Sequence, residues 1–238
     1  MLVSVALASV LGGCESNQER SARIDAHGHE QIAGGTIGMI RVENPTVKVR
    51  RAVIVRGAGA GGGSAAAIEL RTGGRAQANV PVQIDVRDAH GRSVYRNDTV
   101  GLQPSLQHLA LIPPGRSVWW VDDQLLGATA PASVRAHVGT AQAIRRVPHI
   151  ALSGVHFETD AAGTYLTGTV HNRSRVLQRD VPVFAVAQRG DRVVAAGRAL
   201  VPKLPATPGP KPVHFRLLFV GSPSGAKVTL TVAPTAVS

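Results

Sequence analysis

Short valine-rich runs, each ended by a turn that contains glycine or proline, limit most strongly the folds open to this chain. Residues 47–55, 80–86 and 213–220 are runs of this kind. Valine and other β-branched residues favour strands, and glycine and proline favour the turns between them. We find no stretch in which helical periodicity is sustained and capped. The sequence therefore predicts an all-β fold of antiparallel strands.

The expected core is aliphatic. Hydrophobic residues make up 44% of the 238-residue chain, which is enough for a packed interior, but aromatic residues make up only 3%. Valine, alanine, leucine and isoleucine must therefore supply most of the buried area. A chain of this length holds one large domain or two small ones.

An internal repeat favours two domains. Both halves show the order strand, turn, strand, polar loop, Val-Pro-Val strand, glycine turn, strand, Pro-Gly turn and two further strands. The most specific match joins residues 80–82 to residues 181–183. Because proline cannot donate a backbone hydrogen bond, we expect Pro81 and Pro182 at a strand start or a sheet edge. This pattern predicts two tandem antiparallel β-sandwich domains.

The N-terminal residues 1–13 are apolar or small and uncharged, and they are too few to span a bilayer as a helix. The segment ends in Leu11, Gly12, Gly13 and Cys14, which resembles the lipobox of bacterial lipoproteins. The resemblance implies a signal peptide that is cleaved before a lipid-modified Cys14. The alternative is an ordinary secretory signal followed by a chance cysteine. Since Cys14 is the single cysteine, an internal disulfide and a cysteine-based zinc site are excluded.

These features divide the chain into four parts. Residues 1–13 are the expected signal peptide, and residues 14–36 are the lipid-bearing cysteine and a flexible polar tether. Residues 37–142 and 148–238 are the two expected β-sandwich domains.

Each expected domain resembles the immunoglobulin-like (Ig-like) domains of bacterial envelope lipoproteins, especially the type named for an F-x-L-Y-D signature. In the second domain, the loop at residues 171–174 and the residues 184–186 fit part of that pattern. In the first domain, residues 84–88 fit its aspartate. The signature tyrosine is absent from both domains. The resemblance implies two Ig-like antiparallel sandwiches.

The repeat and the signature align the Val-Pro-Val strands differently. The repeat pairs Ile84 with Ala185, whereas the signature pairs Ile84 with Phe184. A slip of one residue exchanges the core and solvent faces of a strand. Which face of residues 80–86 and 181–186 is buried therefore stays open.

The chain is basic, with a formal net charge of +11 from 26 lysines and arginines against 15 acids. Outside the cytoplasm, such a surface is expected to attract anionic lipid headgroups or anionic wall polymers. Nucleic acid is not expected as a partner, because an exported protein rarely meets it. The alternative is that the arginines reflect genomic composition, since they are scattered along the chain.

Gly57, Gly59 and Gly62 form a G-x-G-x-x-G pattern after a strand, as in dinucleotide-binding sites. A short alanine run follows in place of a helix, so we expect a hairpin turn. His27, His29 and Glu30 could contact a metal ion, but they lie in the expected tether. We therefore predict no metal site and no cofactor.

Residues 119–123, which hold Trp119, Trp120, Asp122 and Asp123, raise two further candidates. The adjacent acids could bind calcium, but at a strand end they favour a turn. Alternation along a strand sends Trp119 and Trp120 to opposite faces, so one should pack in the core. The other should be exposed or lie at the domain junction, which makes the pair candidate contact residues.

No serine nucleophile elbow and no carboxylate pair for acid–base catalysis stand out, so we expect no enzyme activity. The sequence favours a membrane-anchored envelope lipoprotein on the extracytoplasmic face of the cell membrane. Its expected role is that of a structural module or an interaction module for wall polymer or another envelope protein. The alternative function is a surface lipoprotein that binds a ligand or a metal.

Overall fold

The computed structural model describes residues 39–57, 63–125, 128–161, 163–206 and 211–235. In these ranges the chain forms β-strands and one short 3-10 turn, η2 (Pro104–Leu106). All strand pairs are antiparallel. The prediction of an antiparallel all-β fold is confirmed.

Two sheets are formed by residues 47–144. The first sheet has the order β1-β2-β6, and the second is built around β3, which pairs with β4, β5, β7 and β8. Their bounds are β1 Val47–Arg56, β2 Ser64–Thr72, β3 Ala76–Arg87, β4 Ser93–Arg96, β5 His108–Ile112, β6 Ser117–Asp122, β7 Ser133–Val138 and β8 Gln142–Ile144. The first and second sheets enclose one aliphatic core, the first core.

Two further sheets are formed by residues 150–232. The third sheet has the order β14-β12-β11-β15, and the fourth has the order β13-β10-β9. Their bounds are β9 Ile150–Asp160, β10 Gly163–Asn172, β11 Gln178–Arg189, β12 Arg192–Leu204, β13 Val213–Leu218, β14 Val220–Gly221 and β15 Lys227–Val232. The third and fourth sheets enclose the second core.

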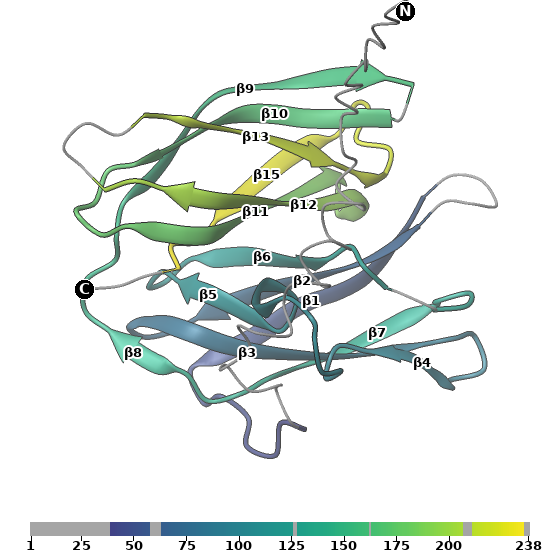
Figure 1. Ribbon diagram of the computed structural model, residues 1–238. Helices are drawn as coiled ribbons and strands as arrows, with labels where there is room; N and C mark the ends of the chain where they lie inside the picture. The colour runs from purple at the N-terminus through teal and green to yellow at the C-terminus, as the bar shows by residue number, and fades with distance from the viewer. Residues whose placement is uncertain (1–38, 58–62, 126–127, 162, 207–210, 236–238) are drawn as a thin grey trace, which may run out of the picture. The chain divides into compact units, whose positions relative to one another are not determined.

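The first sheet also packs against the third, so the four sheets form successive layers (Figure 1). We call this contact the junction. Phe184, Val186 and Ala196 of the third sheet and Ala233 belong to the first core. The described residues belong to one compact unit. The division into domains at residues 37–142 and 148–238 therefore stays a prediction.

The internal repeat extends to the backbone conformation. Asn79 and Asp180 directly precede the two Val-Pro-Val motifs, and both adopt a left-handed conformation, with φ of 51° and 49°. Asparagine and aspartate tolerate this conformation better than other residues with a side chain. Each residue also interrupts its ladder, because neither has a partner in the register of β3 with β5 or of β11 with β12.

Neither proline lies at a strand start, which corrects the expected placement. Pro81 lies inside β3 and Pro182 inside β11, and both strands are central in their sheets. On one side of β3, β8 pairs up to Ala78 and β7 pairs from Val82 onward. Likewise, β15 pairs with β11 from Val183 onward. The missing proline N–H therefore falls where the neighbouring strand has ended.

The burial pattern settles the facing of the two motif strands. Ile84 of β3 lies in the first core, and Ala185 of β11 lies in the second core, so the Val-Pro-Val alignment gives equivalent positions. Phe184 and Val186 point the other way, into the junction. Because β11 is buried on both faces, its apolar residues are nearly continuous in sequence.

We predict that Asp180→Val destabilises the chain by about 1–2 kcal/mol, because a β-branched residue is strained in the left-handed region. Asp180→Gly should stay within about 0.5 kcal/mol of the original stability, because glycine adopts this conformation readily. Urea unfolding followed by circular dichroism measures both. Arg179→Val, at the exposed neighbouring position, is the matched control. Equal losses for the two valine variants would contradict the strain argument.

Candidate functional site

Several residues singled out by the sequence fall outside the described residues. These are Leu11, Gly12, Gly13, Cys14, His27, His29, Glu30, Gly59 and Gly62. Of the glycine pattern, Gly57 is described, and its N–H donates to the Gly63 carbonyl at 2.8 Å. The alanine run that follows forms β2, as the hairpin interpretation requires. In the described part of the chain, no helix is long and apolar enough to cross a membrane.

Both tryptophans of β6 are buried, on opposite faces of the first sheet. The indole N–H of Trp120 donates to the Ser105 carbonyl at 2.9 Å, which places this ring in the first core. Trp119 therefore faces the third sheet, and its backbone N–H donates to the Thr231 hydroxyl of β15 at 3.1 Å. Of the two expected alternatives, exposure and the junction, Trp119 occupies the junction.

Asp122 is fully buried at the end of β6. One carboxylate oxygen accepts a hydrogen bond from the Tyr95 hydroxyl at 2.8 Å, and the other accepts from the Gln124 N–H at 2.9 Å. The second bond closes the turn that the sequence favoured here. Burial raises the pKa of Asp122 to about 6. Burial and the facing Asp122 carboxylate also raise the pKa of the Tyr95 phenol.

Arg198 of β12 crosses the junction to reach the first half of the chain. Its guanidinium lies 3.2 Å from Asp123 Oδ1 and donates to Gln103 Oε1 at 2.9 Å and to Ser105 Oγ at 2.7 Å. The Arg198 side chain is only 5% exposed. Sequence reasoning missed this residue, because nothing local distinguishes it from the other arginines. The two aspartates and Arg198 are thus held by partners inside the protein.

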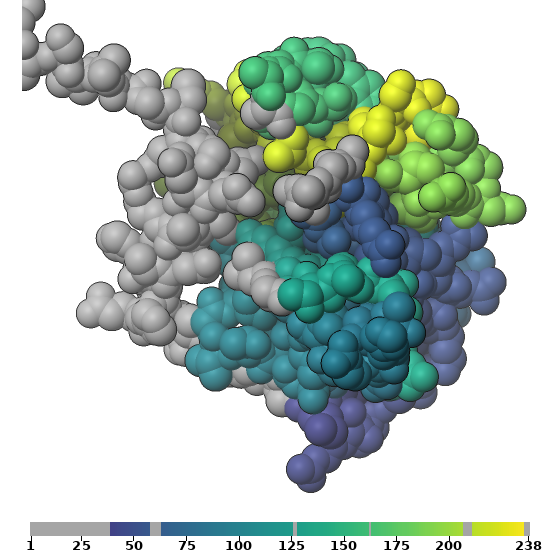
Figure 2. All heavy atoms as spheres, turned by 90° about the vertical axis from the view of Figure 1, so that its right-hand side faces the viewer, coloured from purple at the N-terminus to yellow at the C-terminus, as the bar shows by residue number. Residues whose placement is uncertain are grey.

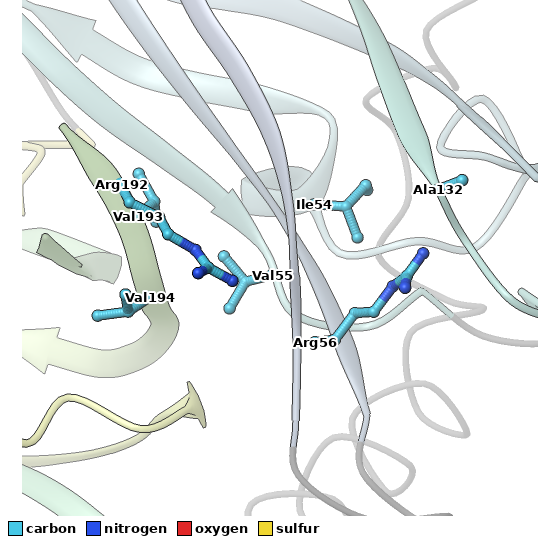
Figure 3. Close-up of a pocket in the computed structure, with 7 residues that line it drawn as sticks. All are labelled: Ile54, Val55, Arg56, Ala132, Arg192, Val193 and Val194. Atoms are coloured by element: carbon cyan, nitrogen blue, oxygen red, sulfur yellow. The ribbon is translucent and has the colours of Figure 1, made fainter. Parts of the chain in front are cut away.

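A hollow of about 370 Å³ lies beside the junction, lined by residues 54–56 of β1, residues 192–194 of β12 and Ala132. Arg192 extends toward Val55, whereas the Arg56 guanidinium turns toward Ala132 (Figure 3). Arg56 donates to the Pro131 carbonyl from its Nε at 3.0 Å and from one terminal nitrogen at 2.5 Å. The two guanidinium groups do not converge on one point.

The turn between β11 and β12 lies against β1 (Figure 2), and Arg192, which follows the turn, lines the hollow. Arg51 donates to the Asp191 carbonyl at 2.9 Å across the contact. Arg56 and Arg192, which line the hollow, are exposed, and so is Arg50, the neighbour of Arg51 in sequence. We call Arg50, Arg51, Arg56 and Arg192 the arginine rim.

The solvent face of the fourth sheet carries a set of hydrogen-bonded polar side chains, which we call the β9 face. At its centre, the Thr167 hydroxyl lies 3.2 Å from His156 Nε2 and 3.2 Å from Glu158 Oε1. The same histidine lies 3.2 Å from Glu158 and 2.8 Å from the Gly154 carbonyl. That carbonyl, and then Glu158, raise the pKa of His156.

Neighbouring strands extend the β9 face. The Arg216 guanidinium of β13 stacks on the Tyr165 ring of β10, 3.5 Å from its centroid, and pairs with Asp160 of β9. His214 lies 3.3 Å from the Thr169 hydroxyl, and it is exposed. Within the described residues, no three histidine, cysteine or acidic side chains are grouped to hold a metal ion.

The edge of the fourth sheet is more exposed than the rest of its surface. Residues 153–160 of β9 are exposed throughout, including Phe157 at 48% and Val155 at 39%. Val155 and Phe157 are alternate residues of β9, so their exposed side chains lie on the same face of the edge, and an exposed apolar patch can mark an interaction surface. The β9 face and this edge are therefore the candidate functional site. No family model, no curated protein and no solved structure matches the chain.

The buried Asp122 predicts an unusual pH dependence of stability. Its carboxyl binds a proton at a pH of about 6 in the folded chain but at 3.8 in the unfolded chain. The contribution of Asp122 to the unfolding free energy is therefore largest below pH 3.8. As the pH rises through 6, about 3 kcal/mol of this contribution is lost. In Asp122→Asn this component should be absent, and the unfolding free energy at pH 7 should rise. Urea midpoints from pH 4 to pH 8 measure it.

Asp85→Asn is a control of opposite sign. Although burial opposes the shift, hydrogen bonds from Ser93 and Arg87 lower the pKa of Asp85. This variant should lose stability at neutral pH, and the difference from the unaltered chain should close as the pH falls. If Asp122→Asn changes the unfolding free energy equally at every pH, the Asp122 carboxyl is not the cause of the pH dependence.

Proposed function

We propose that this chain is a non-enzymatic envelope lipoprotein, anchored in the cell membrane through Cys14 and acting as an interaction module on the extracytoplasmic side. The observation that carries the anchor is the sequence Leu11-Gly12-Gly13-Cys14. Palmitate and related acyl chains are the expected modification. The interaction role is supported by the β9 face, on the solvent side of the fourth sheet, and by the exposed β9 edge.

The strand orders support an Ig-like assignment for both sandwiches. The three-stranded sheet β1-β2-β6 has the same sequence of connections as β9-β10-β13. Opposite each lies a sheet centred on a Val-Pro-Val strand, β3 or β11, whose outer neighbour is the last long strand of the half, β7 or β15. Two packed antiparallel sheets that share the strands in this way are typical of Ig-like sandwiches.

The buried polar groups bond to one another, and this structural role supports the proposal that the chain is not an enzyme. Asp122 accepts from Tyr95 and Gln124, and Asp123 is paired with Arg198. Groups that are buried and paired within the junction do not reach a substrate.

Cys14→Ala tests the anchor. In a bacterial host that exports the chain, the original protein should partition into the detergent phase and carry acyl chains by mass spectrometry. The variant should appear in the soluble exported fraction or accumulate as an unprocessed precursor, because the thiol that accepts the lipid is gone. A variant that matures and partitions like the original would show that the lipobox interpretation is wrong.

The arginine rim predicts salt-dependent binding to anionic surfaces. The full chain with Cys14→Ala should sediment with phosphatidylglycerol vesicles at low salt and much less at high salt, where the Debye length falls below about 8 Å. Arg50→Glu combined with Arg192→Glu should weaken this binding. Arg145→Glu combined with Arg146→Glu changes two exposed arginines elsewhere and is the control. Equal, negligible sedimentation with anionic and neutral vesicles would contradict a role for the charge.

A further inference from the structure

The strand β9 has an open edge. It is the end strand of the fourth sheet and pairs with β10 along Ile150–Asp160. Among the described residues, no strand pairs with its other side (Figure 1). In an antiparallel sheet, alternate residues direct their N–H and C=O groups to opposite neighbours, so half of the β9 backbone is directed at this edge. Such an edge is a template for another strand.

The two faces of this edge differ in chemistry. On the side of the second core, Phe157 lies opposite Leu166 and is half exposed, with its ring 6.2 Å from that of Phe219. Val155 is 39% exposed. On the solvent side, His156 and Glu158 stand two residues apart. The edge thus offers an apolar row and, on the other face, an imidazole that alternates with a carboxylate.

We propose that β9 pairs in an antiparallel manner with β9 of a second copy of this chain, with the two-fold axis at Phe157. In this register Phe157 faces Phe157 of the second copy. His156 faces Glu158 of the second copy, and the same contact occurs twice. Val155 faces Thr159. The pairing joins the two three-stranded sheets into one continuous sheet and covers the exposed apolar side chains.

Charge selects this register over its neighbours. Residues that face each other across a ladder must lie on the same side of the sheet, so the axis can pass through a residue but not between two. An axis at Glu158 would place two carboxylates face to face, and an axis at His156 would place two imidazoles face to face. Like charges directly opposite destabilise a pair of strands, and opposite charges stabilise it.

The local backbone limits the paired segment. Gly154 has φ of +59° at a bulge in β9, and the β9–β10 turn begins after Asp160. The regular stretch between these two points is centred on Phe157.

The proposal rests on the interaction role of the β9 face, and it does not depend on the lipid anchor.

Disulfide trapping in the full chain tests the register, with Cys14→Ala removing the native thiol. Phe157→Cys places two thiols directly opposite each other and should give a disulfide-linked dimer on a non-reducing gel under mild oxidation. Val155→Cys is the matched control, because its two thiols would be offset by roughly 13 Å along the strands, too far for a disulfide. Mixing Val155→Cys with Thr159→Cys chains should restore cross-linking.

The three samples give distinct outcomes. A dimer from Phe157→Cys and from the mixture, but not from Val155→Cys alone, supports the proposal. No dimer from Phe157→Cys, or equal cross-linking by all samples, overturns it. Since Cys14 is absent throughout, neither result bears on the anchor. Thermal unfolding confirms that each variant is folded.

Charge exchange gives a second test by sedimentation equilibrium of the full chain with Cys14→Ala. His156→Glu should weaken dimerisation roughly tenfold, because two attractive contacts become repulsive. Adding Glu158→His to the same chain should restore the original dissociation constant. A monomer at all concentrations before any change to β9, or a single variant that dimerises as well as the double variant, would overturn the proposal.

Discussion

The packing of the first sheet against the third is the contact on which the rest of the structure depends. The strand β2 lies in the middle of the first sheet and is buried on both faces, with Ala65, Ala66 and Ala67 fully covered. Small side chains allow another layer to approach closely on either side. Phe184 and Val186 fill the space from the third sheet. The alanine run therefore marks the strand that must pack in two directions.

Buried polar groups give the junction its specificity. The hydrophobic effect is non-directional, whereas Arg198 meets Asp123, Gln103 and Ser105 in one arrangement of the sheets. Removing one member of such a group leaves a buried charge unpaired, which is strongly destabilising. These contacts thus fix the position of the layers, whereas the aliphatic surfaces supply most of the favourable free energy.

The sequence was sufficient for the all-β class, for the hairpin at Gly57 and for the Val-Pro-Val repeat, because each depends on local chemistry. The left-handed residues were also accessible, since Asn79 and Asp180 precede the motif in both halves. The double burial of β11 was foreshadowed by its nearly continuous apolar run. The burial of Asp122 and the reach of Arg198 were not accessible, because they depend on which sheets meet. The exposed edge of β9 likewise depends on strand order, which periodicity does not encode.

The sharing of the first core has a consequence for the order in which the chain can fold. At the junction, the apolar face of the first sheet is covered by side chains at positions 184, 186 and 196 and by Ala233, which lies near the C-terminal end of the described residues. A chain that emerges from its N-terminus onward leaves that face in contact with water until almost all of it has appeared. The N-terminal half therefore gains its final stability only after the C-terminal strands have packed on that face.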